Sequence, residues 1–174
     1  MVNEIIWRLG LRNISTSRCQ SGNCGSAFRA SVTEALKADY QFNDWNRLVE
    51  IFKNPSLQMI SFTITEKGYT FNEADLARGM NPVFAMGKVC ALLYERYQAG
   101  QLPLTVQSMD NCSHNGDRVK AGVMAYAERW VKDGLVPEAF LAYLKDEQKI
   151  TFPWSMIDKI TPRPHFVRNP PGIL

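Results

Sequence analysis

The clearest pattern in the chain is an alternation of helix-like and strand-like segments in its central part. Apolar residues recur at the spacing of one helical face in four segments, namely residues 43–55, 82–100, 117–131 and 137–147. Two short runs between them, residues 57–65 and 102–109, are rich in apolar and β-branched side chains, which predicts buried strands. Strands that alternate with helices of this length favour βαβ units and a parallel sheet.

The N-terminal part of the chain has no comparable pattern. The stretch NISTSRCQSGNCGS, residues 13–26, is polar and rich in Gly and Ser, and it follows neither a period of two nor one of 3.6. We therefore predict an unassigned polar segment at residues 1–29, a domain at residues 30–164 and a C-terminal tail at residues 165–174.

Composition and charge narrow the class of protein. With 174 residues, 45% apolar and 21% charged, the chain can bury one ordinary globular core. Its net charge is +3, and its Lys and Arg residues are scattered among acidic residues and form no basic run, which argues against a nucleic-acid partner. No apolar run has the length of a membrane span, and the start MVNEIIWRLGLRN does not resemble a secretory signal. We predict a cytoplasmic protein with reduced cysteines and no membrane partner.

Two polar motifs follow the two predicted strands. The first strand leads into Glu66, Lys67 and Gly68, and the second leads into DNCSHNG, residues 110–116. Parallel strands deliver their carboxyl ends to one edge of a sheet, and ligands bind in the crevice outside that edge. We therefore expect both loops to face the same crevice.

The DNCSHNG motif is open to four interpretations. Asp110, Cys112 and His114 could bind a metal, although structural zinc sites use paired ligands in two separate clusters. Cys112 could be a nucleophile with His114 as its base, although no third group that would orient the base can be named. The Asp and Asn side chains could cap the next helix, with Gly116 supplying an unusual backbone conformation. An Asn carboxamide could donate to an oxygen that develops negative charge, as in an oxyanion hole.

Two further clusters are ambiguous on residue type alone. The loop that contains Glu66 and Lys67 could be an ordinary solvated turn. Asp158, within FPWSMIDKITPRP at residues 152–164, could form an ion pair with Lys159 or Arg163, or it could line a pocket among the apolar side chains around it.

Taken together, three motifs resemble the mannitol dehydrogenase family of long-chain polyol and hexuronate oxidoreductases. They are ITEKGY at 64–69, SMDNCSHNGD at 108–117 and FPWSMIDKITP at 152–162, and the resemblance extends from about residue 30 to residue 164. The family includes mannitol 2-dehydrogenase and the fructuronate and tagaturonate reductases. The resemblance implies a metal-independent enzyme that moves a hydride between NAD, or NADP, and a polyol or hexuronate.

The resemblance also implies roles for individual residues. Asn111 resembles the family's oxyanion-hole Asn, which makes it the candidate catalytic residue. Asp158 resembles an Asp on the nicotinamide side of the site. The remaining candidate cofactor-binding residues form the loop after the first strand: Thr65, Glu66, Lys67 and Gly68. No residue is assigned to a metal.

Two parts of the family pattern have no counterpart in the chain: a Gly-rich phosphate turn after a first strand, and the catalytic Lys of a C-terminal helical domain. We therefore expect an α/β fold that is a partial Rossmann-like doubly wound sheet, the second half of a dinucleotide-binding domain without the helical domain. Such a chain is a truncated product or needs a partner polypeptide, and its exposed sheet edge favours self-association. The alternative is a non-catalytic remnant or binding module that keeps the α/β core.

Overall fold

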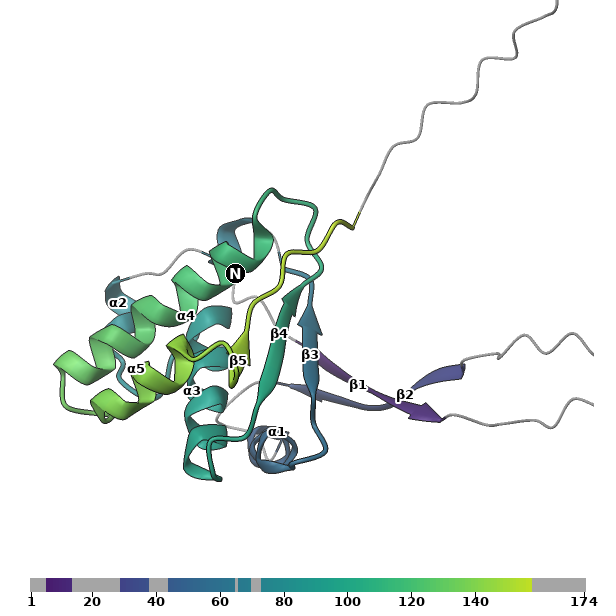
Figure 1. Cartoon of the computed structure of the whole chain (residues 1–174), viewed down its shortest axis with the longest axis horizontal. Coiled ribbons are helices and arrows are strands. Elements are labelled where there is room, and N and C mark those ends of the chain that lie inside the picture. Colours follow the sequence, from purple (N-terminus) through teal and green to yellow (C-terminus); the bar gives the residue numbers. More distant parts are fainter. Residues whose placement is uncertain (1–5, 14–28, 38–43, 65, 70–72, 158–174) are drawn as a thin grey trace, which may run out of the picture.

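The computed structural model describes residues 6–13, 29–37, 44–64, 66–69 and 73–157, which form an antiparallel strand pair and an α/β unit (Figure 1). In chain order the elements are β1 (Ile6–Asn13), β2 (Arg29–Lys37), α1 (Asp44–Lys53), β3 (Met59–Phe62), the 3-10 helix η1 (Glu66–Tyr69), α2 (Glu73–Leu76), α3 (Ala85–Gln98), β4 (Leu104–Ser108), α4 (Asn115–Lys132), α5 (Glu138–Lys145) and β5 (Ile150–Thr151).

The α/β unit is built on a parallel sheet with the strand order β3-β4-β5. Met59 pairs with Thr105, and Leu104 pairs with Ile150. Helix α3 connects β3 to β4, and α4 and α5 connect β4 to β5. All three helices lie on the same side of the sheet (Figure 1), as right-handed crossovers between strands in sequential order require. The prediction of βαβ units in a partial Rossmann-like α/β fold is confirmed.

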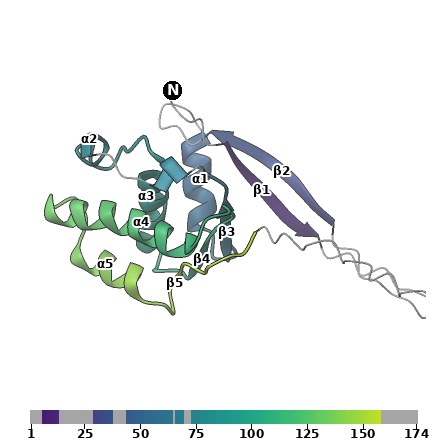
Figure 2. The same cartoon turned by 90° about the horizontal axis from the view of Figure 1, so that it is seen from above.

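The core lies between the sheet and the helices that cover it (Figure 2). Along β4 every second residue is buried, namely Leu104, Val106 and Ser108. The face of α4 that meets the core carries side chains that are fully buried, and these are Val119, Val123, Tyr126 and Trp130. Their offsets of four, seven and eleven residues correspond to one helical face, the pattern on which the prediction of this helix depends. No helix among the described residues is long and apolar enough to cross a bilayer.

Several elements were not predicted from the sequence pattern. Strand β1 lies in the segment left unassigned and pairs with β2, most of which lies in the predicted domain where no strand was expected; the register shifts between Leu9 and Gly10. Strand β5 has two residues, too few to show a period of two. Helix α4 begins at Asn115, two residues before the predicted start. The domain boundaries at residues 29/30 and 164/165 stay a prediction, and the second of them lies outside the described residues.

A buried arginine ties the amino ends of the strands to helix α1. Arg96 of α3 is completely buried, and its guanidinium donates to five backbone carbonyl oxygens at 2.5–3.1 Å, those of Phe52, Asn54, Leu57, Leu102 and Pro103. These carbonyls lie at the end of α1 and in the connections that lead into β3 and β4. A guanidinium has five N–H donors in a fixed plane, so this one side chain can donate a hydrogen bond to each of the five carbonyl oxygens. Burial lowers the pKa of Arg96, yet a guanidinium remains charged.

Replacing this guanidinium is expected to destabilise the fold. Arg96→Met keeps a long side chain but leaves five carbonyl oxygens, one buried and four partly buried, without their donor, so the free energy of unfolding should fall by about 3 kcal/mol. Urea unfolding followed by circular dichroism measures the change. The matched control is Arg129→Met, because Arg129 forms a partly exposed ion pair with Asp133 at the end of α4 and its loss should change the midpoint little. Equal effects of the two substitutions would contradict the role given to Arg96.

Three tyrosines place their hydroxyl groups inside the fold. The Tyr126 hydroxyl donates to Asp75 Oδ2 at 2.7 Å, and the Tyr143 hydroxyl donates to the carbonyl of Leu102 at 2.7 Å. Burial raises the pKa of Tyr143 to about 12 from its usual value of 10.0. Burial and a neighbouring carboxylate raise the pKa of Tyr69 and Tyr126 further. All three phenols therefore stay protonated across the neutral pH range.

These pKa values predict a loss of stability in alkali. In the unfolded chain the phenols ionise near pH 10, whereas in the folded chain they stay neutral to higher pH. The contribution of the buried phenols to the free energy of unfolding is therefore complete below pH 10 and is lost as the pH rises through the folded pKa values. Tyr143 alone should account for about 2 kcal/mol at pH 12. Urea unfolding between pH 8 and 12 tests this, with Tyr143→Phe expected to show a shallower decline. An identical decline in the variant would contradict the assignment.

Candidate functional site

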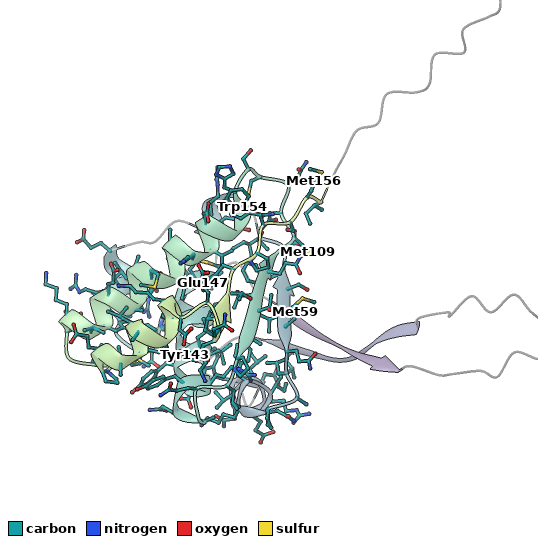
Figure 3. All side chains as sticks on the ribbon, in the orientation of Figure 1. Met59, Met109, Tyr143, Glu147, Trp154 and Met156 are labelled. Atoms are coloured by element: carbon teal, nitrogen blue, oxygen red, sulfur yellow. The ribbon has the colours of Figure 1, made fainter. Side chains whose placement is uncertain are left out.

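The loops that follow β3, β4 and β5 meet at one edge of the sheet. The backbone N–H of Ile64, after β3, donates to Asp110 Oδ2, after β4, at 2.8 Å. The hydroxyl of Ser155, after β5, donates to the carbonyl oxygen of Ser108 at the end of β4. Figure 3 shows Met109, Trp154 and Met156 at this end of the molecule. The three motifs of the family resemblance therefore lie together, as parallel strands require.

A buried hydrogen-bond network joins the first two motifs. Tyr69, the last residue of η1, is 7% exposed, and its hydroxyl donates to Asp110 Oδ2. The same hydroxyl lies 2.5 Å from Ser108 Oγ, and Ser108 is fully buried. Burial and the Asp110 carboxylate raise the pKa of Tyr69, so its phenol keeps the proton that it donates. The carboxylate of Asp110 thus serves as the acceptor that connects the two loops.

Asn115 joins the second motif to the third. This residue is 1% exposed, and its Nδ2 donates to the carbonyl of Asp110 at 3.1 Å and to the carbonyl and hydroxyl oxygens of Ser155 at 2.8 and 2.9 Å. Its Oδ1 accepts from the backbone N–H groups of Gly116 and Ser155 at 2.9 and 3.0 Å. Both ends of the carboxamide are therefore occupied by the protein, and Asn115 is a structural residue of the site.

Gly116 allows the third motif to cross the start of α4. A Cβ atom at this position would lie 2.3 Å from the carbonyl oxygen of Phe152 and 2.7 Å from that of Pro153, closer than any side chain can approach. Gly116 lies in the first turn of α4 and is not among the described glycines with positive φ, so the predicted unusual backbone conformation is wrong, and the requirement here is the close approach of two backbones. The left-handed conformation of this loop belongs instead to His114, with φ 55°.

The structure places the predicted site residues differently. Asn111 is exposed in the loop after β4, and within the described part of the chain no hydrogen bond involves its carboxamide. Gly68 is buried in η1, where a Cβ atom would lie 2.9 Å from Ile64 Cδ1. Glu66 and Lys67 belong to η1, and their side chains lie outside the described residues. Thr65 and Asp158 lie outside them altogether.

The residues that hold the loops together were not among those predicted from the sequence. Tyr69, Ser108, Asn115 and Ser155 all lie within or beside the three motifs, which is the one signal that could have pointed to them. Ser108 and Ser155 are short polar residues at or shortly after a strand end, a common setting that does not reveal a partner 39 or 47 residues away.

The metal and nucleophile interpretations gain no support from the geometry. Among the described residues, no three His, Cys, Asp or Glu side chains converge as metal ligands would. The His114 ring stacks on the Trp154 indole, with centroids 4.3 Å apart and planes 7° from parallel, and its Nδ1 lies 3.8 Å from Asp117 Oδ2. His114 therefore belongs to an aromatic contact with the third motif.

Comparisons with known proteins agree with the motifs. Residues 22–172 match the family described as the mannitol dehydrogenase Rossmann domain. D-mannonate oxidoreductase of Thermotoga maritima is 50% identical over 146 residues, 78% of this chain and 27% of that protein. Mannitol dehydrogenase DSF1 of Saccharomyces cerevisiae is 34% identical over 137 residues, 71% of this chain and 26% of that protein.

A solved structure gives the same result for the fold. A substrate-free D-sorbitol dehydrogenase superposes with a TM-score of 0.51 at 31% identity, covering 67% of this chain and 25% of that one. The chain therefore spans about a quarter of the length of the relatives that it matches. On the family match over most of its residues, the chain belongs to the mannitol dehydrogenase family, within that family's Rossmann domain.

Proposed function

We propose that the chain is part of an oxidoreductase that transfers a hydride between a nicotinamide cofactor and a polyol or hexuronate. The observation that carries the proposal is the different use of the two asparagines in DNCSHNG. The carboxamide of Asn115 is consumed by five hydrogen bonds within the protein, whereas that of Asn111 is exposed at the shared carboxyl edge. Asn111 is therefore the amide that remains available to a substrate.

The proposed chemistry needs little from the protein beyond orientation and an uncharged donor. The nicotinamide ring, when bound, supplies or accepts the hydride. Asn111 Nδ2 donates a hydrogen bond to the substrate oxygen, which gains negative charge as the carbonyl carbon takes up hydride. Asn111 directly follows Asp110, and the hydrogen bonds among Tyr69, Ser108 and Asp110 fix the position of Asp110. A donor that is already oriented avoids a reorganisation cost during the reaction.

The cofactor proposal rests on the edge of the sheet. Open parallel sheets bind nucleotides outside the carboxyl ends of their strands, and β3 and β4 both end at this edge. We assign Thr65, Glu66, Lys67 and Gly68, after β3, and Asp158, beyond β5, to the cofactor side of the site. Either NAD or NADP fits this assignment, and the pair mannonate and fructuronate fits it as well as mannitol and fructose. A cytoplasmic location accords with such substrates.

The proposal is tested by NADH oxidation with the purified chain and fructuronate, tagaturonate or fructose. Asn111→Ala removes the donor, and Asn111→Asp replaces it with an acceptor of equal size, so both should lower kcat about 100-fold. The matched control is Ser113→Ala, an exposed polar residue of the same loop, which should keep the activity of the unchanged chain. Turnover that survives in both Asn111 variants would overturn the role of Asn111. Absence of turnover with every substrate would mean that this chain alone does not form a complete site and that the family chemistry needs further segments.

We also propose that the chain associates with itself or with a partner polypeptide. Seven large apolar side chains of the described residues are exposed, and three of them are more than half exposed: Met59 at 53%, Trp154 at 61% and Met156 at 81%. Exposed apolar groups of this size and an open strand edge favour association. The mass measured by light scattering should rise with protein concentration, and Met59→Gln combined with Met156→Gln should reduce the rise. A concentration-independent monomer would contradict the proposal.

A further inference from the structure

The side chain of Asp110 joins the two loops on either side of the candidate site. Its Oδ2 accepts the backbone N–H of Ile64 at 2.8 Å and the hydroxyl of Tyr69, residues 46 and 41 positions earlier in the chain. The Tyr69 hydroxyl also lies 2.5 Å from Ser108 Oγ. The pair of Tyr69 and Asp110 thus fixes the loop after β4 against the loop after β3.

The backbone of Asp110 is fixed as completely as its side chain. Its N–H donates to Ser108 Oγ at 3.1 Å, and its carbonyl oxygen accepts from Asn115 Nδ2 at 3.1 Å. The same carbonyl accepts from the N–H of Cys112 at 2.9 Å, which closes a three-residue turn centred on Asn111. Asn111 is therefore the exposed tip of a turn whose first residue, Asp110, is held by its backbone N–H, its carbonyl oxygen and its Oδ2.

From these contacts we infer that Tyr69 and Asp110 are positioning residues, which hold the Asn111 turn so that its carboxamide meets the substrate oxygen. The inference rests on the proposed function and extends it to two residues that do not touch the substrate. A displacement of the reacting groups by about 1 Å can cost about 100-fold in rate, so support of this kind has a kinetic effect out of proportion to its energy. The purely structural alternative is that the same contacts only stabilise the fold.

Tyr143 supplies a control that separates these two possibilities. It is 3% exposed and its hydroxyl donates to the carbonyl of Leu102 at 2.7 Å, so Tyr143→Phe removes a buried hydroxyl as Tyr69→Phe does. Figure 3 shows Tyr143 at the end of the molecule opposite Met109 and Trp154. A loss of general stability should follow from either substitution, whereas a loss of positioning should follow from Tyr69→Phe alone.

The kinetic test measures kcat and KM for NADH-dependent reduction by the chain and four variants. Tyr69→Phe should lower kcat about 10-fold with KM within about twofold, because the substrate still binds but its oxygen is less well aligned. Asp110→Ala should lower kcat at least as much. Asp110→Asn should restore most of it, since an amide oxygen can still accept from Ile64 and Tyr69. Unchanged kcat in Tyr69→Phe, or an equal loss in Tyr143→Phe, would overturn the inference.

Amide hydrogen exchange gives a second readout that needs no turnover. In Tyr69→Phe, exchange at Ile64 and at residues 108–112 should accelerate about 10-fold, while in Tyr143→Phe these amides should exchange as in the unchanged chain. If the amides exchange in Tyr69→Phe as they do in the chain without substitutions, the contact between Tyr69 and Asp110 does not hold the loop. This result would overturn the inference even if the chain without substitutions is active. If the unchanged chain has no turnover, the claim that this chain catalyses the reaction by itself fails, and the kinetic purpose of the contact in this chain fails with it. Faster exchange would then leave only a structural role.

Discussion

The positions of strands β3 and β4 depend on hydrogen bonds from the buried guanidinium of Arg96. Among the hydrogen bonds of the described residues it donates to no carboxylate, and five backbone carbonyl dipoles stabilise its charge instead. Those carbonyls belong to the end of α1 and to the connections before β3 and β4, so one side chain sets where both strands begin. Removing a charge of this size from water is costly, and the complete use of its donors offsets that cost.

The opposite end of the sheet is organised by the same kind of contact with a different residue. There the carboxylate of Asp110 accepts from the loop after β3, and the carboxamide of Asn115 holds the segment after β5. Strand order delivers three loops to one edge, but side-chain to backbone hydrogen bonds decide their distances from one another. The consequence for function is that Asn111 stands exposed on a support that is fixed on both sides.

Much of this architecture could be predicted because it follows from the spacing of apolar residues within short segments of the chain. The offsets of Val119, Val123, Tyr126 and Trp130 follow one helical face, and the apolar run from residue 102 to residue 109 contains a strand. The family resemblance added the meaning of the polar loops, since residue types alone left a metal site, a nucleophile, a helix cap and an oxyanion-hole Asn open for DNCSHNG. The candidate Asn111 came from that resemblance, and its exposure accords with the proposed role.

By itself, the sequence determined the helices α1, α3, α4 and α5, the strands β3 and β4, the parallel arrangement of these two strands and the family, because each depends on spacing within a short window or on a linear motif. Only the tertiary structure decided that the carboxamide of Asn115, and not that of Asn111, is hydrogen-bonded within the described part of the protein. It also decided why Gly116 must lack a side chain, and that Tyr69 bonds to Asp110. It also decided the pairing of β1 with β2 and the addition of β5. These features depend on partners tens of residues apart, and no local pattern encodes a contact whose two halves approach only when the chain has folded.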